Sequence, residues 1–160
     1  MEPSEVKSKI KFLALDVDGV LTDGGMYYSN SGDEFKKFNT KDGLGIKRLV
    51  ASGMNVAFIS NGINDVLIRN RAKLLGVQYV YVGLDKKTII LEQWIHELQL
   101  DYSQIAYIGD DINDLEIIDK VGFSACPNDA VKAVKEKANT ILNTKGGEGC
   151  VREFIDTYFF

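Results

Sequence analysis

The stretch Phe12-Leu13-Ala14-Leu15-Asp16-Val17-Asp18-Gly19-Val20 carries the strongest structural signal in the chain. Its first four residues form an apolar run typical of a strand buried on both faces of a sheet. Open α/β sheets bind ligands just beyond the carboxyl ends of their strands, and two carboxylates stand at that position here. Asp16 and Asp18 are separated by one residue, so in an extended stretch they point the same way and repel unless a cation or a shared proton relieves them. The pattern therefore predicts a metal site that also holds a nucleophile.

A calcium-binding loop and a solvated turn are the alternatives for the same residues. An EF-hand loop requires an acid or Asn at its fifth position, Gly at its sixth and Glu at its twelfth. Val20, Leu21 and Tyr27 occupy those positions, which excludes the calcium loop. A plain turn stays open until the rest of the chain is considered.

Length and charge narrow the class of protein. The 160 residues suit one domain, 1–160, with a full hydrophobic core. A balance of 19 basic against 23 acidic residues gives a formal net charge of -4, which argues against a general nucleic-acid binder. Neither a membrane-spanning apolar stretch nor a secretory signal is recognisable, so we expect no membrane partner and a cytoplasmic protein. Cys126 and Cys150 are then expected to be free thiols.

Apolar runs alternate with segments in which apolar residues recur at spacings of three and four. The expected strands are 12–15, 56–59, 80–82, 105–108 and, more weakly, 123–125. The expected helices are 44–51, 65–75, 88–98, 114–120 and 130–138. This alternation predicts an α/β fold of three layers, a Rossmann-like parallel sheet with helices on both faces.

Two segments depart from the alternation. Residues 25–29 and 34–38 alternate around Asn30-Ser31-Gly32-Asp33, which predicts a β-hairpin inserted at about 25–38. Its aromatic side chains should pack either on the same domain or on another copy of the chain. The second departure is the C-terminal part, 145–160, where a glycine-rich tail precedes a last helix at 151–159.

Groups suited to phosphate and Mg²⁺ follow four of the expected strands. They are Asp16 and Asp18 after the first, Ser60-Asn61-Gly62 after the second, Gly83-Leu84-Asp85-Lys86 after the third and Gly109-Asp110-Asp111-Ile112-Asn113-Asp114 after the fourth. Each has an ordinary explanation alone: a helix cap, a solvated lysine, or first-turn acids that complement a helix dipole. Because the carboxyl ends of parallel strands meet at one edge, the four groups together indicate one site.

Phosphoryl transfer is the chemistry that this combination supports. A carboxylate that attacks a phosphate monoester must overcome repulsion between two anions, so the site needs a divalent ion and a cationic side chain. Mg²⁺ suits one or two carboxylates and a phosphate oxygen. In this hypothesis Asp16 forms an aspartyl phosphate, and Asp18 protonates the leaving alkoxide and then activates the water.

The residues resemble the four motifs of the haloacid dehalogenase superfamily, in order and on the expected elements. The matching set is Asp16-x-Asp18-Gly19, Ser60, Lys86 and Gly109-Asp110-Asp111-x-x-Asp114. The resemblance implies that Asp16 is the nucleophile and a Mg²⁺ ligand, and that Asp18 is the general acid/base and binds the metal through its backbone carbonyl. It further implies that Asp110 completes the metal shell, that Ser60 and Lys86 hold the phosphoryl group, and that Asp111 and Asp114 support the site.

The motifs are spaced too closely to hold a cap domain. Ser60 lies 42 positions after Asp18, and Lys86 lies 26 positions after Ser60. Over nearly its whole length the chain resembles the 3-deoxy-D-manno-octulosonate (KDO) 8-phosphate phosphatase family and its relatives acting on sialic acid 9-phosphates. The matching stretches are 16–24, 38–46, 107–111 and 146–154. The resemblance implies a homotetramer with the hairpins at its centre and neighbouring subunits that help to close each site.

The same resemblance suggests where a sugar acid phosphate would bind. It places Thr40 and Lys41 near the phosphate or the sugar, lets Arg71 reach a neighbouring site, and lets residues 145–152 fold over the entrance. Family members that act on octulosonates usually carry Gly-Arg after the second motif, where the arginine can meet the sugar carboxylate; this chain has Asn61-Gly62. KDO 8-phosphate is the expected substrate, and an N-acylneuraminate or other nonulosonate 9-phosphate is the alternative.

Two proteins that are not enzymes remain to be weighed. A receiver domain has its paired acids after the first strand and its lysine after the fifth. Here the pair Asp110-Asp111 follows the fourth strand and Lys86 follows the third. A regulatory or oligomerisation domain of the same superfamily is the other alternative. Retention of Asp16, Asp18, Lys86 and Asp110 together argues against it.

Overall fold

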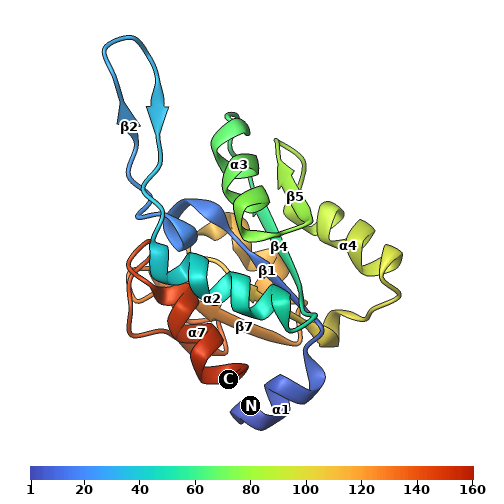
Figure 1. Ribbon diagram of the computed structural model, residues 1–160. Helices are drawn as coiled ribbons and strands as arrows, with labels where there is room; N and C mark the ends of the chain where they lie inside the picture. The colour runs from blue at the N-terminus through green and yellow to red at the C-terminus, as the bar shows by residue number, and fades with distance from the viewer.

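A six-stranded parallel sheet forms the centre of the protein in the computed structural model, which describes residues 1–160 (Figure 1). The strands run in the order β5-β4-β1-β6-β7-β8. Their bounds are Phe12–Leu15 for β1, Asn55–Ser60 for β4, Tyr79–Val82 for β5, Ile105–Ile108 for β6, Phe123–Cys126 for β7 and Thr140–Ile141 for β8. This arrangement confirms the predicted α/β fold.

Helices cover both faces of the sheet, as alternating strands and helices require. One face carries α1 (Pro3–Lys9), α2 (Thr40–Ala51), α3 (Val66–Leu75) and α7 (Cys150–Tyr158), with α2 and α7 side by side (Figure 1). The other face carries α4 (Lys87–Glu97), α5 (Leu115–Ile118) and α6 (Lys132–Lys135). The sheet is therefore the middle of three layers.

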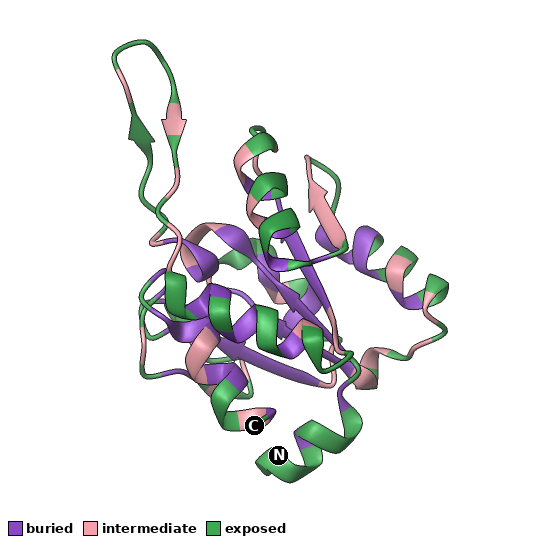
Figure 2. Cartoon of the chain, in the orientation of Figure 1, coloured by how far each residue is buried: buried purple, intermediate pink, exposed green.

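Two apolar cores follow from the alternation of side chains along each strand. In β1, Leu13 and Leu15 pack into the core under α2 and α7, and Phe12 and Ala14 pack into the core under α4. All four residues are buried, and Figure 2 shows the central strands buried along most of their length. At about 1.5–3 kcal/mol for each large side chain, this burial is the main force that fixes the sheet.

Strand β1 lies between β4 and β6, and its end sets where the polar loops meet. Leu15 pairs with Phe58 of β4 and with Ile108 of β6, so all three strands approach the same edge together. The backbone N–H of Asp16 continues the ladder by donating to the carbonyl of Ile108 at 3.0 Å. The residues that follow these strands consequently face one another.

The predicted hairpin is present and projects away from the body (Figures 1 and 2). Strands β2 (Tyr27–Tyr28) and β3 (Glu34–Phe35) pair antiparallel, with Tyr27 opposite Phe35. Tyr28 and Phe35 are 60% and 57% exposed, so these aromatic side chains do not pack on the sheet or its helices. An isolated antiparallel bridge between Thr22 and Phe38 closes the base of the hairpin.

Several elements differ from the sequence-based expectation. The helix expected at 114–120 is reduced to Leu115–Ile118 after a 3₁₀ turn at Ile112–Asp114, and the one expected at 130–138 is reduced to Lys132–Lys135. Helix α1 and the edge strand β8 were not expected. None of the helices combines the length and the apolar character that a membrane crossing demands.

Candidate active site

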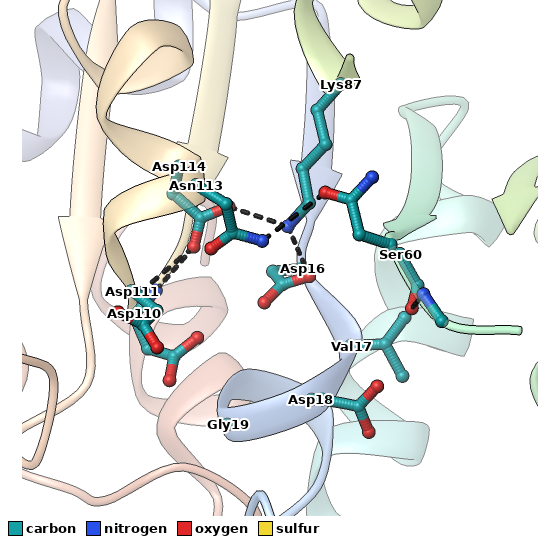
Figure 3. A network of polar contacts seen from close by, with 12 residues as sticks. Asp16, Val17, Asp18, Gly19, Ser60, Lys87, Asp110, Asp111, Asn113 and Asp114 are labelled. Atoms are coloured by element: carbon teal, nitrogen blue, oxygen red, sulfur yellow. Dashed lines mark hydrogen bonds and ion pairs between the residues drawn. The ribbon is translucent and has the colours of Figure 1, made fainter. Parts of the chain in front are cut away.

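A cavity of about 630 Å³ opens at the carboxyl ends of the central strands. The structure brings together there seven of the residues that the sequence singled out. They are Asp16, Asp18, Ser60, Asn61, Gly62, Asp110 and Asp111. In Figure 3, Asp16 stands in the middle, with Ser60 and Asp18 on one side and the Asp110–Asp114 loop on the other.

The centre of the site is a buried ion-pair network. Lys87 Nζ donates to Asp16 Oδ1 at 2.6 Å and to Asp114 Oδ1 at 2.7 Å, and its side chain is 1% exposed. Burial alone would lower the pKa of Lys87, but the charges of Asp16 and Asp114 outweigh burial and raise it. Lys87 is therefore a cation that holds the Asp16 side chain in place.

Lys87 replaces the predicted Lys86, and that prediction is wrong. The Lys86 side chain is 73% exposed, and its Nζ lies 3.9 Å from Glu116 instead of near Asp16. Helix α4 begins at Lys87, which lies three and four residues before the buried Ile90 and Leu91 and so shares their face. Lys86 lies three residues before the exposed Ile89 and four before the buried Ile90, so only Lys87 has buried residues at both spacings. Helical periodicity was thus the signal that could have identified Lys87.

Asp114 organises the loop after β6. Its Oδ1 accepts hydrogen bonds from Lys87 Nζ and, at 2.6 Å, from the hydroxyl of Tyr107. Its Oδ2 accepts from the backbone N–H groups of Asp110 (2.9 Å) and Asp111 (3.2 Å). Asp114 is fully buried, whereas Asp111 is exposed and caps the N–H of Ile112 at 2.7 Å. Of the two supporting acids, Asp114 is the one that contacts the centre.

The carboxylates fit a divalent cation. Asp16, Asp110 and Asp114 each offer one oxygen, and these oxygens lie within 4.8 Å of one another. Both oxygens of Asp114 already accept hydrogen bonds, whereas Asp110 Oδ1 is buried without any partner. Burial, followed by repulsion from Asp114, raises the pKa of Asp16 well above its usual value and that of Asp110 to about 6. A hard cation held by Asp16 and Asp110 would relieve this repulsion and satisfy the unpaired oxygen.

The turn after β1 brings Asp110 close to the backbone. Residues Val17–Leu21 form a short helical turn, in which Gly19 has a φ of 88°. A Cβ atom at Gly19 would collide with the Asp110 carboxylate. Only glycine meets both conditions, because it tolerates positive φ and leaves room for the approaching carboxylate.

Asp18 leaves the same turn and contacts the hairpin instead of the other carboxylates. Its Oδ1 accepts a hydrogen bond from Lys36 Nζ at 2.6 Å, and Lys36 also forms an ion pair with Glu34 at 3.0 Å. Lys36 is the only basic side chain that lines the cavity. Sequence reasoning missed Lys36, because a lysine in an exposed hairpin is ordinarily solvated.

The end of β4 supplies the hydroxyl of Ser60, and the loop that follows supplies Asn61, whose hydrogen bonds connect neighbouring loops. Ser60 is buried, and its Oγ accepts from the N–H of Gly62 at 3.0 Å. Asn61 Nδ2 donates to the carbonyls of Gly83 and Asp85, and Asn61 Oδ1 accepts from Asn113 at 3.3 Å. Asn61 therefore joins the loops that follow β4, β5 and β6.

Three predicted substrate-binding residues lie outside the cavity within one chain. Thr40 and Lys41 are exposed in the first turn of α2, and neither lines the cavity. Arg71 on α3 donates to the carbonyl of Asn39 at 3.0 Å and lies over the Phe38 ring. That Arg71 reaches a neighbouring subunit stays a prediction.

The glycine-rich tail does not cover the entrance. Gly147 donates its N–H to the carbonyl of Val20 at 3.0 Å and accepts at its own carbonyl from Asn39 Nδ2. Residues 145–149 pack behind the turn that carries Asp18, none of them lines the cavity, and α7 begins directly after them. The expectation of a closing tail is therefore wrong for the single chain.

Comparison with known proteins gives consistent matches. A family model described as haloacid dehalogenase-like hydrolase matches residues 80–155. The 3-deoxy-D-manno-octulosonate 8-phosphate phosphatase KdsC of Yersinia pestis is 40% identical over 93% of this chain and 79% of its own length. The crystal structure of the Yersinia pestis phosphatase superimposes with a TM-score of 0.92 at 38% identity, over 96% of this chain and 83% of that one.

A second solved structure contains ligands. The 3-deoxy-D-manno-octulosonate 8-phosphate phosphatase of Moraxella catarrhalis, in complex with a magnesium ion, a phosphate ion and KDO, superimposes with a TM-score of 0.90. It is 35% identical and covers 95% of this chain and 88% of its own. Together with the geometry of the acidic site, these matches show that the chain belongs to the haloacid dehalogenase superfamily and, within it, to the family of the 3-deoxy-D-manno-octulosonate 8-phosphate phosphatases.

Proposed function

We propose that the protein is a magnesium-dependent phosphatase that hydrolyses a phosphorylated 3-deoxy-2-ulosonic acid, with KDO 8-phosphate as its first substrate and KDO and phosphate as products. The observation that carries the proposal is the position of Asp16. It ends the central strand, is held by the buried Lys87, and faces an open cavity beside Asp110, Ser60 and Asp18.

The reaction proceeds in two transfers of the phosphoryl group. A carboxylate oxygen of Asp16 attacks phosphorus, the bond to the sugar oxygen breaks, and Asp18 donates its proton to that oxygen. Water then attacks the phosphorus of the aspartyl phosphate while Asp18 takes a proton from it, and the bond to the Asp16 oxygen breaks. Phosphate leaves, and both aspartates return to their starting states.

Cationic and hydroxyl groups support these transfers. We assign Ser60 and Lys87 to holding the phosphoryl group, with Lys87 in the role first expected for Lys86. Asp114 fixes Lys87, and Asp111 caps the 3₁₀ turn that follows it. Asp16 and Asp110, with the backbone carbonyl of Asp18, would hold Mg²⁺, which when bound neutralises phosphate charge and so lowers the barrier to attack by a carboxylate.

The substrate assignment rests on the relatives and on the size of the cavity. Relatives that match over most of the chain carry the name KDO 8-phosphate phosphatase, and about 630 Å³ suits a sugar acid. The pair Asn61-Gly62, in place of the Gly-Arg that octulosonate enzymes usually have, favours a nonulosonate 9-phosphate as the second candidate. Asn61 already holds neighbouring loops together and is therefore a weaker ligand for the sugar.

We further propose a homotetramer in the cytoplasm. The exposed apolar side chains of the hairpin, Met26, Tyr27, Tyr28 and Phe35, support self-association because such a cluster is costly in water. The free buried thiols of Cys126 and Cys150 suit a reducing compartment.

A substrate panel tests the activity. Purified protein is assayed for phosphate release from KDO 8-phosphate, N-acetylneuraminate 9-phosphate and glucose 6-phosphate, with Mg²⁺ and with a chelator. We expect turnover of a sugar acid phosphate that requires Mg²⁺ and little turnover of glucose 6-phosphate. Absence of turnover on every acid sugar phosphate would refute the function.

Light scattering tests the assembly. We expect a mass near four chains at micromolar concentration. A monomer with full activity would refute the tetramer and leave the phosphatase proposal intact.

A further inference from the structure

The hairpin carries one lysine, Lys36, whose charged side chain is nearly buried and lines the cavity. The Lys36 side chain is 7% exposed, whereas that of its neighbour Lys37 is 60% exposed. Lysine is rarely buried to this extent unless it is paired, and Lys36 is paired with two carboxylates, Asp18 at 2.6 Å and Glu34 at 3.0 Å. Such a residue in an otherwise exposed hairpin needs an explanation.

The backbone of the hairpin fixes where Lys36 points. Side chains alternate along a strand, so Glu34 and Lys36 face one side while Phe35 and Lys37 face the other. Glu34 and Lys36 line the cavity with Asp16 and Asp18, and Phe35 and Lys37 do not. Two residues further on, Phe38 is bridged to Thr22 at the end of the turn that carries Asp18. Lys36 is thus anchored to the same turn as the carboxylate that it contacts.

The two oxygens of Asp18 have different surroundings. Oδ1 accepts from Lys36 Nζ and has a longer contact, 3.5 Å, with the Thr22 hydroxyl. Oδ2 makes no hydrogen bond within the chain. It faces Gly62, because a Cβ atom added to Gly62 would lie 3.9 Å from Asp18 Oδ2. Because the Asp18 side chain is 39% exposed, neighbouring packing restrains it little. The ion pair with Lys36 is its strongest tie.

We propose that Lys36 is the positioning residue of Asp18: by holding Oδ1, it keeps Oδ2 directed into the cavity, where the proton is transferred. The inference rests on the proposed function, in which Asp18 donates a proton to the sugar oxygen and later accepts one from water. Of the two carboxylates that Lys36 contacts, Asp18 is the nearer and is the one with a proposed chemical role, so these contacts tie Lys36 to Asp18. The hairpin therefore contributes to proton transfer although it lies outside the sheet.

Two substrates with different leaving groups can show whether Lys36 positions Asp18 or has only a general structural role. The quantity compared is kcat/KM for each substrate. A sugar alkoxide needs a proton when it leaves, whereas p-nitrophenolate is stable without one. The value of kcat/KM reports the steps up to the first irreversible one, here the transfer to Asp16. A displaced Asp18 should therefore lower kcat/KM for KDO 8-phosphate and spare kcat/KM for p-nitrophenyl phosphate.

The experiment compares Lys36→Met with the matched control Lys37→Met on both substrates. General acid catalysis contributes about 10²–10⁴-fold, so we expect Lys36→Met to lower kcat/KM for KDO 8-phosphate by about 10- to 100-fold. For p-nitrophenyl phosphate we expect a change below about threefold, on the same reasoning about the acid. Lys37→Met should change neither. The ratio of the two kcat/KM values does not depend on the folded fraction, so partial misfolding cannot imitate the result.

Two further variants close the argument. Lys36→Arg keeps a cation near Asp18 and should recover most of the loss. In an Asp18→Asn background, Lys36→Met should have no further effect on KDO 8-phosphate, because a residue that acts only through Asp18 is silent without it. Equal losses on both substrates, or an additional loss in the Asp18→Asn background, would overturn the inference. Wild-type protein inactive on these two substrates and on N-acetylneuraminate 9-phosphate would instead overturn the proposed function, and the inference with it.

Discussion

The edge of the sheet and the hairpin contribute to one cavity, but they are stabilised in different ways. Asp16 extends a strand that is paired on both sides and buried on both faces, and its exposure is 5%. The hairpin has two residue pairs and no core of its own, and its aromatic side chains remain exposed. An isolated two-stranded hairpin is marginally stable in water. Packing therefore fixes the first region, whereas the bridge at the base of the hairpin and the ion pairs of Lys36 and Lys37 with Asp18 and Asp23 fix the second.

This difference matches the chemistry that we assign to each region. Formation of the aspartyl phosphate requires a carboxylate held against repulsion, and the buried Lys87 and the surrounding strands provide that restraint. Proton transfer by Asp18 instead depends on Lys36, which the hairpin carries. A change in the hairpin can thus alter proton transfer without disturbing the nucleophile.

Replacing the nucleophile is expected to have the largest effect. Asp16→Asn should lower turnover by about 10⁴-fold or more, because an amide cannot form the phosphorylated intermediate. Stability should not fall, since burial raises the pKa of Asp16 and so opposes its charged form in the folded protein, and Asn keeps an acceptor for Lys87. Phosphate release and urea unfolding check the two parts. Full activity in this variant would contradict the mechanism.

The next largest effect is expected from replacing Lys87, and the adjacent Lys86 provides the matched control. Lys87→Met leaves Asp16 and Asp114 buried together without a cation, which should cost about 3–5 kcal/mol in the free energy of unfolding and remove turnover. Lys86→Met alters an exposed side chain and should change stability by less than about 0.5 kcal/mol. Urea unfolding and phosphate release of both variants provide the measurement. Similar losses in the two would show that burial does not separate their roles.

The strands, and the polar residues that follow each of them, were predictable from the sequence. A parallel strand buried on both faces appears as a short run of consecutive apolar residues. The apolar runs at 12–15 and 105–108 correspond to β1 and β6 residue for residue, and those at 56–59 and 80–82 fall within β4 and β5. Once these strands are parallel, the groups after them must meet at one edge. The positions of Asp16, Ser60 and Asp110 follow from that alone.

The remaining features depend on contacts distant in sequence. Strand β8 has two residues and forms only because β7 offers an edge, and the Asp114 turn is shaped by hydrogen bonds to neighbouring N–H groups. The sequence predicts Tyr107 only as a strand residue, yet its hydroxyl contacts Asp114. Lys36 becomes buried only because the hairpin base folds back on the turn that carries Asp18. Contacts between residues so far apart in the chain cannot be predicted from local sequence patterns.

The contact between α2 and α7 carries a buried acid, Asp42, whose ionisation should be visible in the pH dependence of stability. Asp42 in α2 accepts from the N–H of Arg152 in α7 at 2.7 Å, and its Oδ2 is buried without a partner. Burial raises the pKa of Asp42 from 3.8 to about 6. The folded protein then binds this proton more tightly than the unfolded chain does, so Asp42 lowers stability as pH rises from about 4 to about 6.

Asp42→Asn should remove this contribution. At 1.36 kcal/mol per pH unit, wild type should lose up to about 3 kcal/mol more than the variant between pH 4 and pH 7. The readout is the change with pH, because the Asn Nδ2 would itself be buried where Oδ2 lacks a partner. Urea unfolding of both proteins across that range gives the difference. Parallel pH profiles would mean that Asp42 titrates alike in both states.

The smallest change in the free energy of unfolding is expected for a substitution in the hairpin. Comparing it with a substitution in the sheet tests directly whether the two regions are stabilised in different ways. Phe58 in β4 is fully buried and Phe35 in the hairpin is 57% exposed. Phe58→Ala should lower the free energy of unfolding by about 3–5 kcal/mol at any protein concentration. Phe35→Ala should change it by less than about 0.5 kcal/mol in dilute protein while abolishing the dependence of Tm on concentration that an assembly through the hairpin confers. A loss of several kcal/mol for Phe35→Ala at every concentration would show that the hairpin packs on its own chain, and the two regions would then be held by the same force.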